Sequence, residues 1–250
     1  MNIFLSLELL KMKRKKFLLP IILFFLVGTI WFVAITLMGI NAKEDNKNIL
    51  SIINNAMTVD SLIMPLIIGT MCSMLFDIEH NGKTFRLLNI SGQSIWQLFT
   101  AKRLMTLIIV FNLCIIQLAL IVYMCVTNNI PLGLINIFKF ICSYLISSLV
   151  LIDIHLSISL FIKKQSIGVT VALAGSFLAL ITGGMLPKII QLFIPWQYYL
   201  FLNPTSVNIS NDTFVFSQNN YYILSFIFVT FIYVSIIFLE KAKIRKGEFI

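Results

Sequence analysis

The stretch Phe17–Ile40, FLLPIILFFLVGTIWFVAITLMGI, contains no charged side chain. An α-helix needs about 20 apolar residues to cross the hydrocarbon core of a bilayer, so this stretch is long enough to span a membrane. It is longer than the apolar part of a cleavable signal peptide, and no small-residue cleavage site follows it. The stretch therefore predicts an uncleaved transmembrane helix.

The rest of the chain has the same apolar character. Hydrophobic residues make up 59% of the 250 residues and charged residues 12%, whereas soluble domains carry about 25% charged residues. The mean hydropathy is +0.96. A soluble fold of this size could not bury so much apolar surface. The composition therefore excludes a soluble enzyme, a disordered chain and a secreted disulfide scaffold.

Five further apolar stretches complete a set of six. The predicted spans are 17–40, 61–76, 104–126, 140–162, 166–186 and 221–239. The second is short for a span, so it either extends back into 54–60 or thins the bilayer locally. No linker or repeat divides the chain. We therefore expect an all-α membrane protein with six transmembrane helices in a single transmembrane domain over 1–250.

The segment 189–202, between the fifth and sixth predicted spans, is apolar but interrupted by proline. Pro195 lies inside it and Pro204 follows it, so the segment is too short and too broken to span. Because irregular backbone cannot face lipid at depth, we expect a re-entrant or interfacial element packed on the outer surface. Its aromatic residues suit the belt at the headgroup level; they are Trp196, Tyr198, Tyr199 and Phe201.

The net charge of +9 comes from cations clustered beside the apolar stretches. Cytoplasmic loops of membrane proteins are rich in Lys and Arg. With the N-terminus inside, the inner segments hold 15 of the 19 Lys and Arg residues and the outer loops hold four. We therefore expect both termini in the cytoplasm. The high content of Ile, Phe, Asn and Lys favours a bacterial cell membrane. We expect the clustered cations to contact lipid headgroups rather than nucleic acid.

Helical spacing also marks the N-terminal flank, where Ile3, Phe4, Leu7 and Leu10 alternate with charged residues. This pattern predicts an amphipathic helix lying on the inner membrane surface. An irregular basic flank is the alternative. We favour the interfacial helix.

The longest predicted cytoplasmic loop is 77–103, between the second and third spans. Its run Asn81-Gly82-Lys83-Thr84 is not a phosphate loop, because that motif needs a glycine where Asp77 stands. Apolar residues at helical spacing follow the run, and a short helix with an exposed apolar face suits docking into a groove on a soluble partner. An ordinary charged loop anchored by Trp96 is the alternative.

This loop and the proline-containing element together resemble those of type 2 ABC-transporter permeases. The loop residues are Glu79, Gly82, Lys83, Thr84, Leu87, Leu88 and Trp96, with Lys102-Arg103 opening the third span, and the element residues are Pro187, Pro195, Trp196 and Pro204. The resemblance implies a six-span permease with cytoplasmic termini, an N-terminal interfacial helix and a coupling helix on which an ABC ATPase docks. The loop departs from the family pattern where Asn89-Ile90-Ser91-Gly92 replaces a proline, and we expect Gly92 to break the helix instead.

Within that family, the small size and short outer loops are similar to those of lantibiotic-immunity exporter permeases, which give bacteriocin resistance to a Gram-positive producer. This resemblance implies that the chain expels a hydrophobic, amphipathic peptide from the membrane. It implies ATP and Mg on the partner ATPase, no cofactor on this chain, and a second permease chain, identical or homologous. The alternatives are a permease for another hydrophobic substrate and a scaffold or sensor subunit without transport.

Asp153 and His155 are the ionisable residues deepest in a predicted span. Such residues are costly in a bilayer and are candidates for function by default. Because they are two residues apart on a helix, they face nearly opposite sides. His155 then shares a face with Ser148 and Ser159, and Asp153 shares the other with Ser157. For Asp153, a translocation path and a structural hydrogen bond between helices stay equally open.

No catalytic or metal-binding pattern is visible in the sequence. The cysteines Cys72, Cys114, Cys125 and Cys142 lie in apolar stretches without a CxxC pair, which indicates buried small hydrophobic residues. An intramembrane hydrolase would need a Ser–His dyad, paired Asp or a metal-ligand set at matched depth. The sequence therefore predicts a transporter subunit rather than an enzyme, with no catalytic residue and no metal site.

Overall fold

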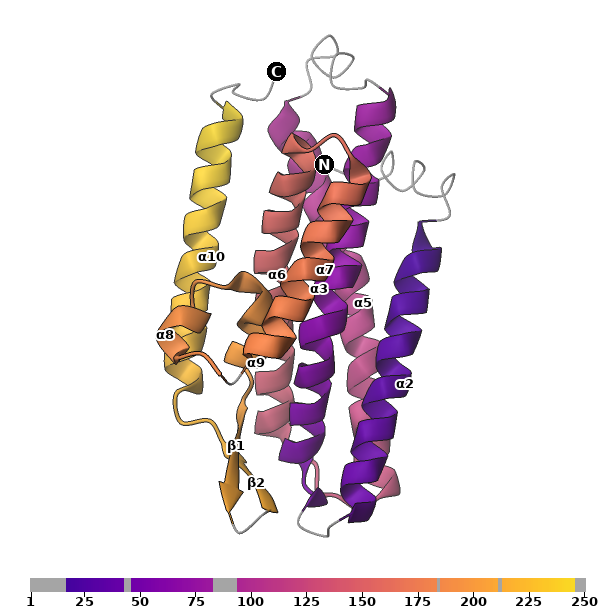
Figure 1. Ribbon diagram of the computed structural model, residues 1–250, viewed down its shortest axis with the longest axis vertical. Helices are drawn as coiled ribbons and strands as arrows, with labels where there is room; N and C mark the ends of the chain where they lie inside the picture. Colours follow the sequence, from indigo (N-terminus) through magenta and orange to yellow (C-terminus); the bar gives the residue numbers. More distant parts are fainter. Residues whose placement is uncertain (1–16, 43–45, 83–93, 184, 211–212, 246–250) are drawn as a thin grey trace.

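The computed structural model of the chain describes residues 17–42, 46–82, 94–183, 185–210 and 213–245. Six long helices lie side by side and alternate in direction (Figure 1). They are α2 (Leu18–Ala42), α3 (Ile49–Gly82), α5 (Ile95–Thr127), α6 (Leu134–Phe161), α7 (Gln165–Thr182) and α10 (Tyr222–Arg245). All six are long and apolar enough to cross a membrane. The prediction of a helical membrane protein with six spans is confirmed.

The helix α3 is the centre of the bundle and differs most from the predicted spans. It covers 34 residues rather than 61–76, and it packs against α2, α5, α6 and α7. Its start is fixed by Asn48, whose Oδ1 accepts a hydrogen bond from the Leu50 N–H at 3.1 Å. The second span therefore extends back through 54–60, which was one of the two alternatives, and it reaches further, to Ile49.

Polar side chains in the first half of α3 explain why hydropathy understates its length. Three of them are hydrogen-bonded to other parts of the chain. The hydrogen bonds run from Asn203 Nδ2 to Asn54 Oδ1 (2.9 Å), from Asn55 Nδ2 to Thr36 Oγ1 (3.4 Å) and from Gln117 Nε2 to Asp60 Oδ2 (2.9 Å). Buried polar groups are tolerated when they are hydrogen-bonded. These residues therefore face protein, and the helix continues through them.

Small residues line the contact between α3 and α7. A Cβ added at Gly69 of α3 would collide with the Cβ of Ala172, and one added at Gly168 of α7 would collide with the hydroxyl of Ser73. Small residues let membrane helices approach closely and gain van der Waals contact. The two helices are therefore packed backbone against backbone along this line.

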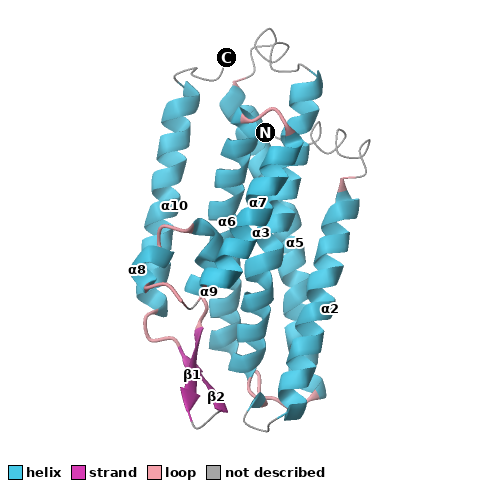
Figure 2. Ribbon diagram, viewed as in Figure 1, coloured by secondary structure: helices cyan, strands magenta, loops and turns pink. Residues whose placement is uncertain are grey.

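Between α7 and α10 the chain forms three short helical segments and a hairpin (Figure 2). The segments are α8 (Lys188–Gln191), η2 (Pro195–Gln197) and α9 (Tyr198–Phe201). The strands β1 (Thr205–Ser210) and β2 (Thr213–Gln218) pair antiparallel, with Thr205 opposite Gln218. The short helices lie well inside the height of the bundle (Figure 1), and we keep the name re-entrant element for 187–204 as the prediction has it. The hairpin is the one departure from the all-α prediction among the described residues.

Two ends of the bundle are distinguished by their connections (Figure 1). At the upper end α3 finishes, α5 starts, α6 turns into α7, and α10 finishes. The lower end holds the α2–α3 and α5–α6 connections and the hairpin. The segments predicted to be cytoplasmic thus adjoin the upper end. The interfacial helix predicted over 1–16 lies outside the described residues.

Candidate functional site

A buried ion pair joins the upper ends of α3 and α5. Lys102 Nζ lies 3.1 Å from Glu79 Oε1, and neither side chain is exposed. The same ammonium group donates to the Leu75 carbonyl at 2.9 Å and lies 5.3 Å from the centroid of the Phe76 ring. Glu79, expected in a solvent-facing loop, thus has its side chain inside the bundle. The pair fixes the two helices that flank 83–93 relative to each other.

The first turn of α5 is closed by a capping box. The Gln97 N–H donates to Ser94 Oγ, and the Ser94 N–H donates to Gln97 Oε1, both at 3.2 Å. Trp96 lies in this turn, stacked on Phe99 with ring centroids 6.1 Å apart. Trp96 therefore belongs to α5 rather than to a separate loop helix, and Gly82 is the exposed last residue of α3. Of the other predicted docking residues, Lys83, Thr84, Leu87 and Leu88 lie outside the described residues.

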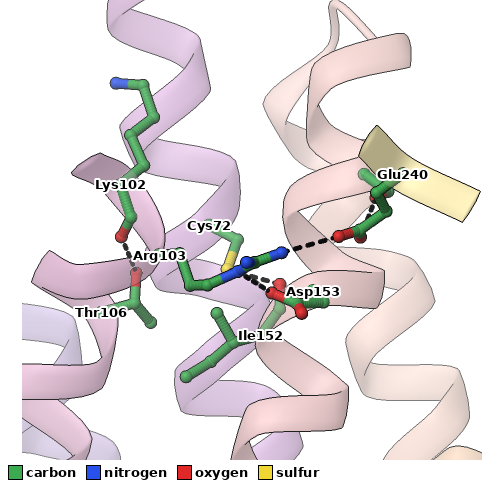
Figure 3. Close-up of polar contacts among 8 residues, drawn as sticks. Cys72, Lys102, Arg103, Thr106, Ile152, Asp153 and Glu240 are labelled. Atoms are coloured by element: carbon green, nitrogen blue, oxygen red, sulfur yellow. Dashed lines mark hydrogen bonds and ion pairs between the residues drawn. The ribbon is translucent and has the colours of Figure 1, made fainter. Parts of the chain in front are cut away.

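Arg103, the next residue along α5, lies between two carboxylates from other helices (Figure 3). Its Nε is 2.5 Å from Oδ1 of Asp153 on α6, and its Nη2 is 2.7 Å from Oε2 of Glu240 on α10. Ser157 Oγ donates to the second oxygen of Glu240 at 2.7 Å. Asp153 is fully buried, and only 12% of the Arg103 side chain is exposed. This cluster ties α5, α6 and α10 together.

The chemistry of arginine explains why it occupies this position. The guanidinium is always charged and presents donors in a planar fork, so it can serve two acceptors at once. Its carbon lies 5.6 Å from the Trp96 ring and 5.3 Å from the Phe99 ring, which cover it with aromatic surface. Sequence reasoning found Asp153 but missed Arg103 and Glu240, because both stand at the edges of apolar stretches. The available signal was that a carboxylate at depth requires a cation at the same depth.

His155 faces the opposite side of α6, as its spacing from Asp153 predicts. The ring is fully buried, and its Nε2 accepts a hydrogen bond from Trp196 Nε1 at 3.3 Å. The two rings meet edge to face, 6.0 Å apart. Because an indole nitrogen only donates, His155 is neutral there with its proton on Nδ1. His155 thus links α6 to the re-entrant element.

The other polar residues of the two α6 faces follow the same division. The Ser148 hydroxyl shares a 2.6 Å hydrogen bond with the Tyr199 hydroxyl of α9. The Ser159 carbonyl accepts from His80 Nε2 of α3 at 3.0 Å. One face of α6 therefore contacts α3 and the re-entrant element, and the other contacts α5 and α10.

Prolines stand at the boundaries of the short segments between α7 and α10. Pro187 precedes α8, Pro195 opens η2, and Pro204 separates α9 from β1. Proline suits such starts because the first helical N–H groups have no partner within the helix. Trp196 fits against α7 because Gly175 has no side chain: a Cβ there would collide with the indole.

Two tyrosines of α9 correct the expected position of the aromatic residues. Tyr198 and Tyr199 are 1% and 0% exposed, so the prediction that they join a belt at the headgroup level is wrong. Tyr199 meets the Tyr144 ring edge to face at 5.7 Å. The Tyr198 hydroxyl donates to the Leu192 carbonyl at 2.7 Å, and burial raises the pKa of this phenol to about 12. Both tyrosines hold the element against the bundle.

The described part of the chain contains no group of three His, Cys, Asp or Glu side chains that could hold a metal ion. The four cysteines are free; Cys72, Cys114 and Cys125 are buried and Cys142 is half-buried. The polar clusters therefore consist of ion pairs and hydrogen bonds between helices. They can hold or transmit a movement of the helices.

The family model described as ABC-2 family transporter protein matches residues 4–179. The match runs from before α2 into the last turn of α7 and includes the 83–93 segment. No curated protein and no solved structure matches the chain.

Proposed function

The chain belongs to the ABC-2 family of transporter proteins, and we propose that it is the permease of an exporter that expels an amphipathic antimicrobial peptide from the membrane. A permease of this family is a non-catalytic, multi-pass membrane subunit. It pairs with an ATPase subunit, which binds the ATP. The direction of transport and the cargo are the parts that we propose.

The observation that carries the proposal is a buried ion pair between the two helices on either side of 83–93. The Glu79–Lys102 pair joins the helices that enter and leave this segment. A push on the segment by a docked ATPase would therefore move α3 and α5 together. Because α3 packs on α2, α5, α6 and α7, this movement would reach most of the bundle. In this proposal Gly82 and 83–93 receive the ATPase, and buried Glu79 positions them.

The charge distribution supports a cytoplasmic upper end. The segments that adjoin this end hold 15 of the 19 Lys and Arg residues, and membrane proteins keep such segments inside. The hairpin and the re-entrant element then face the outer side. This orientation gives an ATPase access to 83–93 and gives the outer leaflet access to the lower half of the bundle.

A second permease chain fits against α2 and α7. Both helices pack on α3 and both present large exposed apolar side chains, including Leu23 and Ile30 on α2 and Phe177 and Ile181 on α7. Movement of α3 would change the spacing of α2 and α7 at such an interface. The peptide cargo is supported by the resemblance to lantibiotic-immunity permeases, in chain size and in the short connections at the lower end.

Transport is tested by reconstituting the chain with its partner ATPase in liposomes that contain a fluorescent cationic amphipathic peptide. We expect ATP to remove the peptide from the membrane, and a neutral peptide of equal hydrophobicity to remain. Gly82→Trp places a bulky side chain on the exposed end of α3, and we expect it to stop removal. The matched control is Asn220→Trp, which alters an exposed residue near the opposite end and should transport normally.

The same experiment separates the rival functions. Removal of the neutral peptide or of another hydrophobic probe, but not of the cationic peptide, would reject the proposed cargo and favour a permease for a different substrate. If ATP moves no probe while the ATPase stays bound, the chain is a scaffold or sensor subunit and the proposal is wrong.

A further inference from the structure

A further buried carboxylate, besides Glu79, Asp153 and Glu240, lies away from the upper end, in the middle of the bundle. Asp60 of α3 is 3% exposed. It stands 11 residues from the start of α3, and its partner Gln117 stands 10 residues from the end of α5. At about 1.5 Å per residue, both are roughly 15 Å from the lower ends of their helices. Asp60 is therefore at the depth of the hydrocarbon core.

Among the described residues, Asp60 has one polar partner and no cation. Gln117 Nε2 donates to its Oδ2 at 2.9 Å. Its Oδ1 has no hydrogen bond within this part of the chain, yet it is not among the fully enclosed polar atoms that lack a partner. Asp60 thus differs from Glu79, Asp153 and Glu240, which are each paired with Lys or Arg. A single carboxylate at this depth is costly unless a cation reaches it.

The carboxyl group borders a narrow cleft between α2, α3 and α5. The cleft is lined by Phe25, Gly28, Thr29, Phe32, Val59, Asp60, Ile63 and Gln117. The space inside the cleft has room for about one water-sized group, and an ammonium group is of that size. Two phenylalanines of α2 that are seven residues apart, Phe25 and Phe32, flank the space, and Gly28 between them packs against Ile63 of α3. Rings beside a carboxylate favour a bound cation.

The cleft lies beside the lipid-facing surface of the bundle. Leu26 and Ile30, next to the cleft on α2, are 54% and 69% exposed, and Ile116 beside Gln117 on α5 is 48% exposed. A molecule entering from the bilayer would meet apolar side chains first and the carboxyl group last. This order suits an amphipathic molecule with an apolar body and a small cationic end.

We propose that this cleft binds the primary ammonium group of an amphipathic molecule that enters from the bilayer, with Asp60 as its anion. The proposal rests on the proposed function, because it supplies the cationic cargo group with a recognition site. Gln117 holds the carboxyl group in place, and the apolar body lies against α2 and α5. Anionic and neutral amphiphiles lack the charge that offsets the buried carboxylate.

The test measures equilibrium binding of a fluorescent dodecylammonium probe to the full chain in phosphatidylcholine nanodiscs, whose lipids carry no primary amine. A dodecanol probe with the same fluorophore measures the contribution of the apolar body. We expect the chain to bind the ammonium probe at least tenfold more tightly than the alcohol. Asp60→Asn should abolish this preference. Asp77→Asn, on the same helix but near the upper end, should keep it.

A second variant decides the question if Asp60→Asn does not fold. Thr29→Trp fills the half-buried wall of the cleft without touching the carboxyl group, and we expect it to lower ammonium binding at least tenfold. Equal binding of the two probes by the unaltered chain, or undiminished ammonium preference in a folded Asp60→Asn or Thr29→Trp chain, would overturn the proposal. Because binding needs no ATPase, lost binding with intact transport rejects this site alone. Intact binding without transport rejects the proposed function alone.

Discussion

At the scale of single residues, the ion pairs at the upper end of the bundle are arranged as one cation against one or two anions. Lys102 faces Glu79, and Arg103 faces Asp153 and Glu240. Removing one member of a buried ion pair costs more than the pair contributes, because the remaining charge stays in a low-dielectric setting. The cluster around Arg103 is therefore asymmetric. The loss of Arg103 leaves two buried carboxylates without a cation, whereas the loss of Asp153 leaves the Arg103–Glu240 pair intact.

This asymmetry gives a prediction for stability. Arg103→Met should lower the free energy of unfolding in detergent by about 3–5 kcal/mol. Asp153→Asn keeps an acceptor for Arg103 Nε and the pair with Glu240, so it should cost only about 1 kcal/mol. Denaturant titration of both variants checks the order, and the exposed α5 variant Asn112→Ala serves as the control. Equal losses in the two variants would show that the carboxylates do not depend on Arg103.

Only some of these residues could be predicted from the sequence. Asp153 and His155 stand out because they interrupt a long apolar run, and their helical spacing correctly separates their faces. Arg103 and Glu240 do not stand out, because charges at the edges of spans normally face the cytoplasm. The three-dimensional pairing of α5, α6 and α10 is needed to show that they turn inward.

At the scale of elements, the close packing of α3 on α7 depends on glycine. A Cβ at Gly69 would collide with Ala172, whereas a Cβ at Gly39 of α2 would meet nothing within 4 Å. The same substitution should therefore have opposite effects at the two positions. Overpacking of a tight contact is destabilising, and alanine in an open helical position adds helix propensity.

We expect Gly69→Ala to lower the free energy of unfolding by about 1–3 kcal/mol and Gly39→Ala to leave it unchanged or raise it by up to about 1 kcal/mol. Thermal unfolding of the two variants in the same detergent measures the difference. A Gly69→Ala protein as stable as the unaltered chain would mean that α3 and α7 are not in close contact in the folded protein.

The elements differ in how much of them could be predicted from the sequence. Five of the predicted spans overlap one long helix each, because an apolar run of 20 residues has few alternatives, but α5 and α6 begin several residues before the predicted starts at 104 and 140. For α3, an extension through 54–60 was one of two alternatives and its start at Ile49 was not predicted, because Asn54, Asn55 and Asp60 lower the hydropathy of this stretch. Asn48 and the apolar spacing after it signal the helix start. The hairpin was missed because Val207 and Phe216 belong to two short strands beside a polar turn, a weak pattern next to long helices.

At the scale of the whole molecule, the proposed function has a docked ATPase push on the upper end of α3 and α5, and the contacts of α3 pass this movement to the other helices. The number of spans, the family and the non-catalytic role follow from composition and from the family match over 4–179. The proposed path of the movement does not follow from composition or from the family match. It depends on the Glu79–Lys102 ion pair and on the central place of α3. Both come from contacts between residues that are distant in the sequence.

The most direct measurement is the rate of ATP hydrolysis by the partner ATPase, alone and together with the chain in nanodiscs. We predict that the chain raises this rate several-fold, that Gly82→Trp returns it to the rate of the ATPase alone, and that Asn220→Trp leaves the increase intact. An equal increase with the Gly82→Trp chain, or no increase with the unaltered chain bound to the ATPase, would contradict the claim that work enters through the upper end of α3 and α5.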